Sequence, residues 1–259
     1  MNVSPGIEER RNEDGGFGPV LGAPSEPEAT ALMALAFDDA PARGWLSRAQ
    51  LPDGSVGVRA GAVFRDVTAL ATLALPAGDA RERGLDRLVA TRGLNGPDPE
   101  VLAEGWPWTD DAHGWVEPTA WGLLALRRGR PAARERIDDA LGMLRERECV
   151  AGGWNYGSRT TLGVDLVPFV QTTALALLAI GDEEPSLGSR ARTLLEDLWR
   201  AESAGILSLA TAVCALDVAG SPQAAIAREA LTRAFAAGTQ DNVTAAWATF
   251  AFQRRGPWT

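Results

Sequence analysis

The stretch GWVEPTAWGLLAL, residues 114–126, places a carboxylate and a proline directly before a Thr-Ala pair and then continues as a nearly unbroken apolar run. Because the run has no polar stripe, it is typical of a helix that is buried on all sides. Glu117, two residues before the threonine, therefore stands in the first turn of a helix that we expect to lie inside the protein.

The same pattern occurs six times along the chain, at spacings of 38, 51, 54, 38 and 33 residues. The pairs are Thr30-Ala31, Thr68-Ala69, Thr119-Ala120, Thr173-Ala174, Thr211-Ala212 and Thr244-Ala245. An apolar run follows each pair, and amphipathic stretches such as ARERIDDALGMLRER lie between the runs. These spacings are typical of one helical hairpin per repeat, with an inner and an outer helix.

An inner and an outer helix repeated about six times most economically close into a ring, because an open stack would leave an apolar face exposed at its end. We therefore predict an all-α fold, an (α/α)6 toroid that forms a single domain over residues 1–259. The first unit has no outer helix before its turn, so residues 1–12 are an N-terminal segment and the ring is expected to close imperfectly at the termini. Strand patterns are nearly absent.

The composition limits the class of function. The chain has 259 residues, 46% of them hydrophobic and 23% charged, which is ordinary for a globular protein. Its apolar runs are too short to cross a membrane, and its first residues lack the apolar core of a signal peptide, so we expect a cytoplasmic protein. A net charge of −9 with scattered arginines disfavours nucleic-acid binding. Cys149 and Cys214 have no C-x-x-C spacing, and reduced, partly buried thiols are expected.

Glycine-rich turns precede the first four inner helices: DGGFG (14–18), DGSVG (53–57), GWPW (105–108) and GGWNYG (152–157). The segment RGWLSRAQLPDGSV matches a QW motif at Arg43, Gly44, Leu46, Gln50 and Gly54, with Val56 in the place of the tryptophan. With these motifs the chain resembles, over nearly its whole length, the prenyltransferase and squalene-cyclase repeat family. The resemblance implies the same toroidal fold.

In the class II terpenoid cyclases of that family, the acidic residue two positions before the threonine protonates an alkene or an epoxide. The resemblance carries this role to Glu117. The equivalent positions in the other units are Glu28, Asp66, Gln171, Leu209 and Asn242. The resemblance thus implies a catalytic group in which Glu117 is the acid and Asp66 and Glu28 tune it or bind polar groups.

Helical spacing adds a physical argument for Glu117. Residues four apart share a helix face, so Trp121 points the same way as Glu117, whereas Thr119 points away. Burial and like charges raise a carboxyl pKa, and aromatic faces stabilise a carbocation. We expect an isoprenoid substrate to contact the following residues, most of them aromatic: Trp108, Trp115, Trp121, Trp154, Tyr156, Phe169, Gln171, Asn242 and His113.

Structural roles are the favoured interpretation of Glu28 and Asp66, and for Glu117 they explain the position about as well as catalysis does. Acidic residues in a first helical turn favour the macrodipole, Ser25-x-x-Glu28 has capping-box spacing, and tryptophans in the turns suit staples between hairpins. The family pattern D-x-D-D is also reduced here to one glutamate followed by Pro118. Class II cyclases pair two toroids, whereas this chain has one, so a homodimer or a partner chain is an open alternative.

A second branch of the family, the protein prenyltransferase β subunits, holds zinc through Asp, Cys and His. His113 is the one histidine here, and no D-x-C accompanies it, so we expect no metal and no cofactor. TDDAHG (109–114) lacks the third carboxylate of the aspartate-rich magnesium motif of terpene synthases. His113 is expected to cap or pack in a loop, close enough to Glu117 to orient it.

Three hypotheses follow from the sequence. The first is a class II-like terpenoid cyclase in which Glu117 starts the reaction by protonation. The second is a non-catalytic toroid that binds an isoprenoid or a peptide. The third is a toroid glycosidase or lyase that uses paired carboxylates and aromatic platforms. Fold alone does not choose among them.

Overall fold

The computed structural model describes residues 6–60, 63–94, 104–201 and 205–259, and nearly all of their regular structure is helical. Each of the six Thr-Ala pairs lies at the start of, or inside, one of the most buried helices. These inner helices are α2 (Pro27–Phe37), α4 (Thr68–Ala74), α6 (Val116–Gly129), α8 (Val170–Ile180), α10 (Ile206–Val218) and α12 (Asn242–Gln253). The prediction of a predominantly helical, single fold is confirmed.

The outer helices are more polar and half-exposed, as their amphipathic sequences predict. They are α3 (Ala40–Ala49), α5 (Asp79–Ala90), α7 (Arg134–Glu146), α9 (Pro185–Ala201) and α11 (Gln223–Ala234), the last followed by the 3-10 turn η1 (Phe235–Ala237). Each packs against the inner helix that precedes it in the chain. The predicted N-terminal segment contains a four-residue helix, α1 (Ile7–Arg10), and residues 1–5 of that segment lie outside the described residues.

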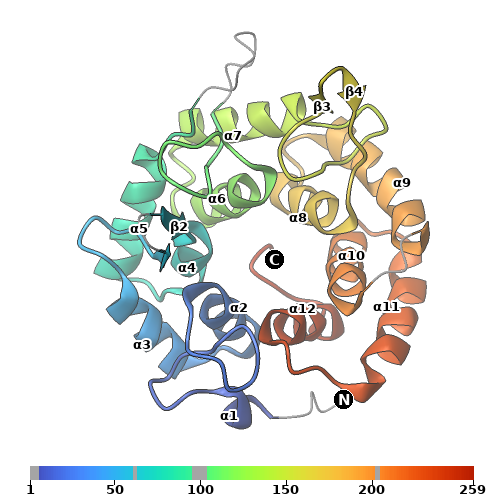
Figure 1. The fold of residues 1–259 in the computed structure, drawn as a ribbon. Helices are drawn as coiled ribbons and strands as arrows, with labels where there is room; N and C mark the ends of the chain where they lie inside the picture. The colour runs from blue at the N-terminus through green and yellow to red at the C-terminus, as the bar shows by residue number, and fades with distance from the viewer. Residues whose placement is uncertain (1–5, 61–62, 95–103, 202–204) are drawn as a thin grey trace.

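The inner helices contact one another in chain order, from α2 through α4, α6, α8 and α10 to α12, and α12 packs against α2. Figure 1 shows these six helices around a common centre, with the outer helices around them. Small side chains allow this close packing: in α8, for example, every residue except Gln171 is buried, and three of the eleven are alanines.

Two short antiparallel ribbons interrupt the helical pattern. One joins β1 (Gly57–Ala60) to β2 (Val63–Asp66), and the other joins β3 (Thr160–Thr161) to β4 (Val164–Asp165). The sequence predicts almost no strands, and both ribbons lie in the turns before inner helices. The second ribbon turns at Leu162 and Gly163, which both have positive φ. The first carries Arg65 and Asp66 to the start of α4.

The two ends of the chain both contact α12 or its neighbours. The N-terminal turn pairs with the start of α12 through Leu21 N to Gln240 O and Asn242 N to Pro19 O, both 2.8 Å. After α12 the C-terminal residues run toward the ring centre in Figure 1, where Arg128 of α6 donates to Pro257 O at 2.8 Å. In the part of the chain described here, no helix is long and apolar enough to cross a membrane.

Candidate functional site

A central cavity of about 210 Å³ is enclosed by residues from all six inner helices. Its apolar lining is Leu32, Leu70, Trp121, Tyr156, Leu175, Leu207, Val243 and Trp247. Its polar lining is Glu28, Arg65, Glu117, Gln171, Thr172 and Thr211. The carboxylates lie in the first turns of α2 and α6, so the polar groups gather toward the end of the ring where the inner helices begin.

The threonines of the first four Thr-Ala pairs point away from this cavity. Each hydroxyl accepts a hydrogen bond from a backbone N–H in the preceding turn. The bonds join Phe17 to Thr30 at 2.9 Å, Val56 to Thr68 at 2.8 Å, Trp106 to Thr119 at 3.0 Å and Trp154 to Thr173 at 3.0 Å. The residue two positions before such a threonine lies on the opposite face of the helix. In three units it lines the cavity together with the residue four further on: Glu28 with Leu32, Glu117 with Trp121, and Gln171 with Leu175.

Glu117 is the most perturbed carboxyl that the described residues place in the cavity. Glu117 is half-buried and lines the cavity. Burial, with a smaller contribution from the charge of Glu28, raises the pKa of Glu117 to about 7. The charge of Arg65 and a hydrogen bond with Trp121 act in the opposite direction but are outweighed. At neutral pH Glu117 is therefore present as both acid and carboxylate.

Glu28 faces the same cavity but has a direct cationic partner. Arg65 Nη1 lies 2.7 Å from Glu28 Oε2, and the Arg65 guanidinium lies 4.6 Å from the centre of the Trp108 ring. The contact is a charge-assisted hydrogen bond, which Arg65 donates and Glu28 accepts. Burial and the charge of Glu28 raise the pKa of the neighbouring Glu26. The cavity thus combines a carboxyl that holds a proton near neutral pH with one that is paired as a carboxylate.

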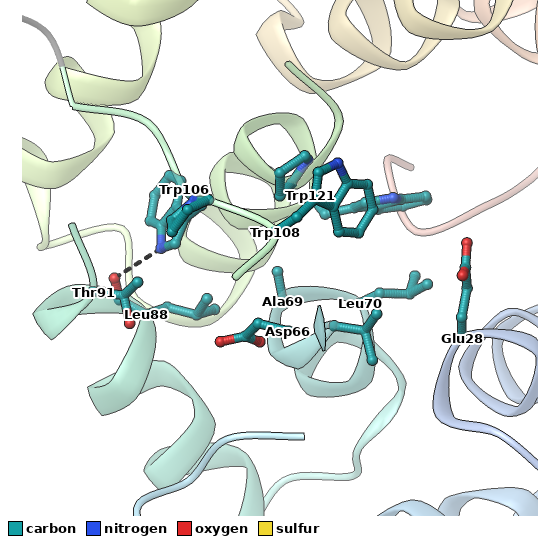
Figure 2. A pocket seen from close by; sticks show the side chains of 12 residues that line it. Glu28, Asp66, Ala69, Leu70, Leu88, Thr91, Trp106, Trp108 and Trp121 are labelled. Carbon is teal, nitrogen blue, oxygen red and sulfur yellow. Dashed lines mark hydrogen bonds between the residues drawn. The ribbon is translucent and has the colours of Figure 1, made fainter. Parts of the chain in front are cut away.

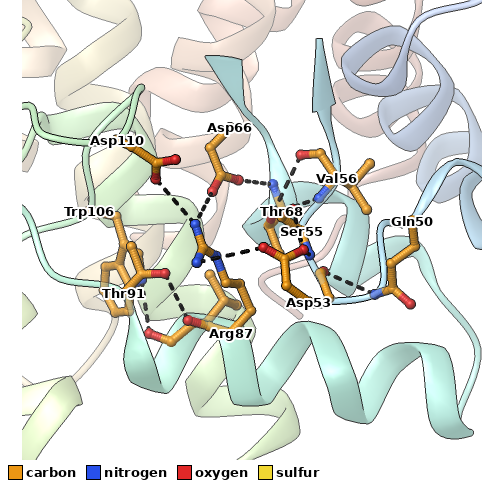
Figure 3. A network of polar contacts seen from close by, with 12 residues as sticks. Gln50, Asp53, Ser55, Val56, Asp66, Thr68, Arg87, Thr91, Trp106 and Asp110 are labelled. Carbon is orange, nitrogen blue, oxygen red and sulfur yellow. Dashed lines mark hydrogen bonds and ion pairs between the residues drawn. The ribbon is translucent and has the colours of Figure 1, made fainter. Parts of the chain in front are cut away.

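Asp66, the third acidic position, lies in a network centred on Arg87 of α5, which Figure 3 shows. Its Oδ1 accepts from Thr68 N at 2.7 Å, and its Oδ2 lies 4.0 Å from Arg87 Nη2. Arg87 also approaches Asp110 at 3.2 Å and Asp53 at 3.8 Å. Burial raises the pKa of Asp66 against the opposing hydrogen bonds of Thr68 and the charge of Arg87. Asp66 therefore holds a turn, and it does not line the central cavity.

A smaller apolar pocket lies beside the cavity, between α4, α5 and α6 (Figure 2). It shares Glu28, Leu70 and Trp121 with the cavity, and its volume of about 20 Å³ holds no more than a water-sized group. Trp106 and Trp108 form one wall. The Trp106 indole N–H donates to Leu88 O at 3.1 Å, so this wall is fixed to the outer helix α5.

Two of the aromatic rings that line the cavity, Trp121 and Trp247, contact each other, and Trp247 continues into a cluster of rings outside the lining. The ring of Trp247 lies 6.0 Å from that of Trp121 and is stacked on Trp258 at 5.4 Å with an interplanar angle of 15°. Phe250 packs edge-on against both Trp247 and Trp258. Trp258, near the C-terminus, thus packs against the Trp247 ring and helps to fix its position.

Of the other predicted substrate contacts, Tyr156 and Gln171 line the cavity and the rest do not. Tyr156 lines the cavity and contacts Phe169, which is half-exposed, and Gln171 donates from Nε2 to Ser208 Oγ at 3.3 Å. Trp115 is also half-exposed and is the residue directly before α6. The remaining ones are outside the cavity lining and have structural partners: Trp154 with Leu144 O, Asn242 with Arg10 and Gly18 O, and His113 with Leu94 O.

Arg65 and Trp247 line the cavity and were not among the predicted site residues. Arg65 reaches it from β2, which the sequence pattern does not reveal. Trp247 follows Thr244 by three positions, whereas Trp121 follows Thr119 by two, so the cavity face of α12 is displaced by one residue. In α10 the displacement differs again, because Leu207 and Thr211 line the cavity and Leu209 does not. The one sequence signal for Trp247 is that it is an aromatic residue within the apolar run that follows Thr244.

The described residues contain no group of three or more His, Cys, Asp and Glu side chains arranged to hold a metal ion. Cys149 and Cys214 are both free and buried, and burial raises the pKa of each thiol. Comparison with protein-family models and with curated proteins gave no match to this chain. The site is therefore interpreted from its own geometry.

Proposed function

We propose that the chain is an (α/α)6 toroid whose cavity performs acid-initiated chemistry on a short isoprenoid alkene or epoxide, with Glu117 as the proton donor. The observation that carries the proposal is a carboxyl with a pKa of about 7 beside the Trp121 indole, inside a cavity with predominantly apolar walls. The cyclic helix contacts support the toroid, and the resemblance to cyclase repeats supports the reaction class.

Proton transfer is most effective when the pKa of the acid lies close to the working pH, which Glu117 satisfies at neutral pH. A carboxyl with this pKa is a weak acid toward an unactivated double bond. An epoxide oxygen is far more basic than a double bond, so epoxides are the preferred substrates within the proposed class. Protonation weakens a C–O bond of the epoxide, and Trp121 and Trp247 present ring faces that stabilise the developing carbocation.

The cavity volume of about 210 Å³ is below the range of roughly 300–1,000 Å³ that is usual for drug-sized ligands. A short, branched hydrocarbon therefore suits the cavity better than a chain of thirty carbons. The Glu28–Arg65 pair provides a polar position for a hydroxyl group on such a substrate.

One observation favours a second candidate, a glycosidase or lyase: Glu28 and Glu117 place two carboxyl groups in one cavity, as sugar hydrolysis requires. Eight of the fourteen lining residues are apolar, however, which suits a hydrocarbon better than a sugar ring.

The test is turnover by the purified protein with terminal epoxides and alkenes of ten- and fifteen-carbon prenyl alcohols, followed by gas chromatography and mass spectrometry. We expect a cyclic product, and Glu117→Gln is expected to lower the rate by about 100-fold or more because the proton donor is lost. Glu148→Gln is a matched control, since Glu148 is also a partly buried glutamate but pairs with Arg190 on the outer surface. Equal rates for both variants would contradict the role of Glu117.

A further inference from the structure

The two glutamates of the cavity have different surroundings, although they occupy the same position in their repeats. Glu28 is ion-paired with Arg65 at 2.7 Å. For Glu117, no arginine or lysine nitrogen in the described part of the chain lies within ion-pair distance. Both side chains line the same small cavity, with Trp121 on its wall. A carboxyl group that favours its protonated form, beside a carboxylate that is paired with an arginine, gives the cavity an acid and a base.

We propose that Glu28 is the base that ends the reaction and that Arg65 is a positioning residue that holds the Glu28 carboxylate in place through their ion pair. This inference rests on the proposed function. It adds a second catalytic residue and determines the type of product, because a base inside the cavity removes a proton where water would otherwise add.

The proton balance of the complete reaction closes without a co-reactant. The O–H bond of Glu117 breaks as its proton binds the epoxide oxygen or an alkene carbon, which leaves a carbocation on the substrate. A ring forms when a second double bond attacks that cation. The C–H bond next to the new cation then breaks, its electrons form a double bond, and its proton binds Glu28. Transfer of that proton to Glu117, through solvent, restores both groups, so the product is an isomer of the substrate.

Charge complementarity supports this order of events. The carboxylate of Glu28 attracts a cation that develops in the cavity, while the Arg65 charge is directed to Glu28 and to the face of Trp108. The Arg65 side chain is 40% exposed, so solvent partly screens its charge. The other charged groups that act on this pair are Glu117 and Glu26.

The first test compares products of the wild type, Glu28→Gln and the matched control Glu148→Gln with the epoxide panel. We expect Glu28→Gln to consume substrate but to release about tenfold more of the water adduct relative to the cyclic alkene, because the cation is no longer deprotonated in the cavity. A second variant, Arg65→Gln, is expected to shift the products in the same direction because the 2.7 Å contact that positions Glu28 is lost, and Arg65→Lys is expected to restore the wild-type ratio. Thermal unfolding of each variant verifies that it is folded.

The second test needs no turnover. A prenyl chain of ten carbons with a dimethylamine head, protonated at pH 7, resembles the carbocation, and its binding to the full chain is measured by calorimetry. We expect about tenfold weaker binding by Glu28→Gln and unchanged binding by Glu148→Gln.

Identical product ratios for the wild type and Glu28→Gln, or identical amine binding, would overturn the role of Glu28. A failure of the proposed function has a different signature: the wild type consumes no member of the panel, or Glu117→Gln consumes it as fast as the wild type. That result overturns the reaction and the base step together, whereas a changed product ratio alone concerns Glu28.

Discussion

Asp66 and Glu117 occupy the same place in two consecutive repeats, two residues before the threonine of a Thr-Ala pair, yet their surroundings differ. Asp66 accepts from Thr68 N at 2.7 Å and lies next to Arg87, within a network of three aspartates. Glu117 faces an apolar cavity beside Trp121. None of the ion pairs among the described residues includes Glu117, and the charge of Arg65 acts on it only from across the cavity. An equivalent position in a repeat therefore does not give an equivalent role.

The largest stability effect is expected from Glu117→Gln at alkaline pH. Folding raises the pKa of the Glu117 carboxyl from 4.5 in the unfolded chain to about 7. As the pH rises through this range, the unfolded chain loses the proton more readily than the folded protein, so the folded state is destabilised. Below pH 4.5 both states hold the proton, and this cost disappears. Glu117→Gln removes the ionisation, so it should raise the free energy of unfolding by up to about 3 kcal/mol at pH 8 and by little at pH 4.

Urea unfolding at the two pH values measures this effect. Glu148→Gln, the variant of an outer-surface ion pair, should show no gain at pH 8. An equal change for Glu117→Gln at pH 4 and pH 8 would contradict the raised pKa.

Arg87→Leu should have the next largest effect, since it removes the cation from the network at Asp66. The partly buried carboxylate of Asp66 is left beside Asp53 and Asp110, and we expect a loss of about 2 kcal/mol at pH 7. Lowering the pH to 4 should reduce this loss, because protonation relieves the repulsion. The matched control is Arg233→Leu, which removes an exposed pair with Glu229 at 4.0 Å and should change stability by less than about 0.5 kcal/mol. Equal losses for the two variants would show that the network at Asp66 has no structural role.

The third prediction concerns the threonine that both repeats share. Thr119→Val leaves the buried Trp106 N–H without its 3.0 Å acceptor, and Thr68→Val does the same to Val56 N–H. We expect each variant to lose about 1–2 kcal/mol in urea unfolding. Thr211→Val should lose less, since the Thr211 hydroxyl donates only to Ser208 O in its own helix, at 3.0 Å. A larger loss at Thr211 would contradict the assigned role of the threonines.

Much of the fold is predictable because the hairpin repeat is a pattern of apolar and amphipathic segments, and helical periodicity reports burial directly. The Thr-Ala register also places Glu28, Glu117, Trp121 and Gln171 on the cavity lining, since residues four apart share a helix face. In α10 and α12 this register fails. The glycine-rich turns precede only the first four inner helices in the sequence, and in α12 Val243 lines the cavity in place of the expected Asn242, with Trp247 four residues further on.

The electrostatic contacts of the site are not predictable in this way. Arg65 lies next to Asp66 in the sequence, but β2 directs it to Glu28, which is 37 residues away. Trp154 and Asn242 have the residue types of ligand contacts, and their polar atoms are occupied by Leu144 O, Arg10 and Gly18 O. Pairings between residues so distant in sequence depend on tertiary packing, which a local pattern does not encode.

The most direct test of the account is the titration of the Glu117 side-chain carboxyl by NMR, in full-length protein carrying ¹³C-labelled glutamate, with Glu117→Gln to assign the signal. We predict a midpoint near pH 7 and a shift to lower pH in Glu28→Gln, because the repulsion from Glu28 is removed. A midpoint near the ordinary value of 4.5 would contradict the account, since Glu117 would then hold no proton at neutral pH.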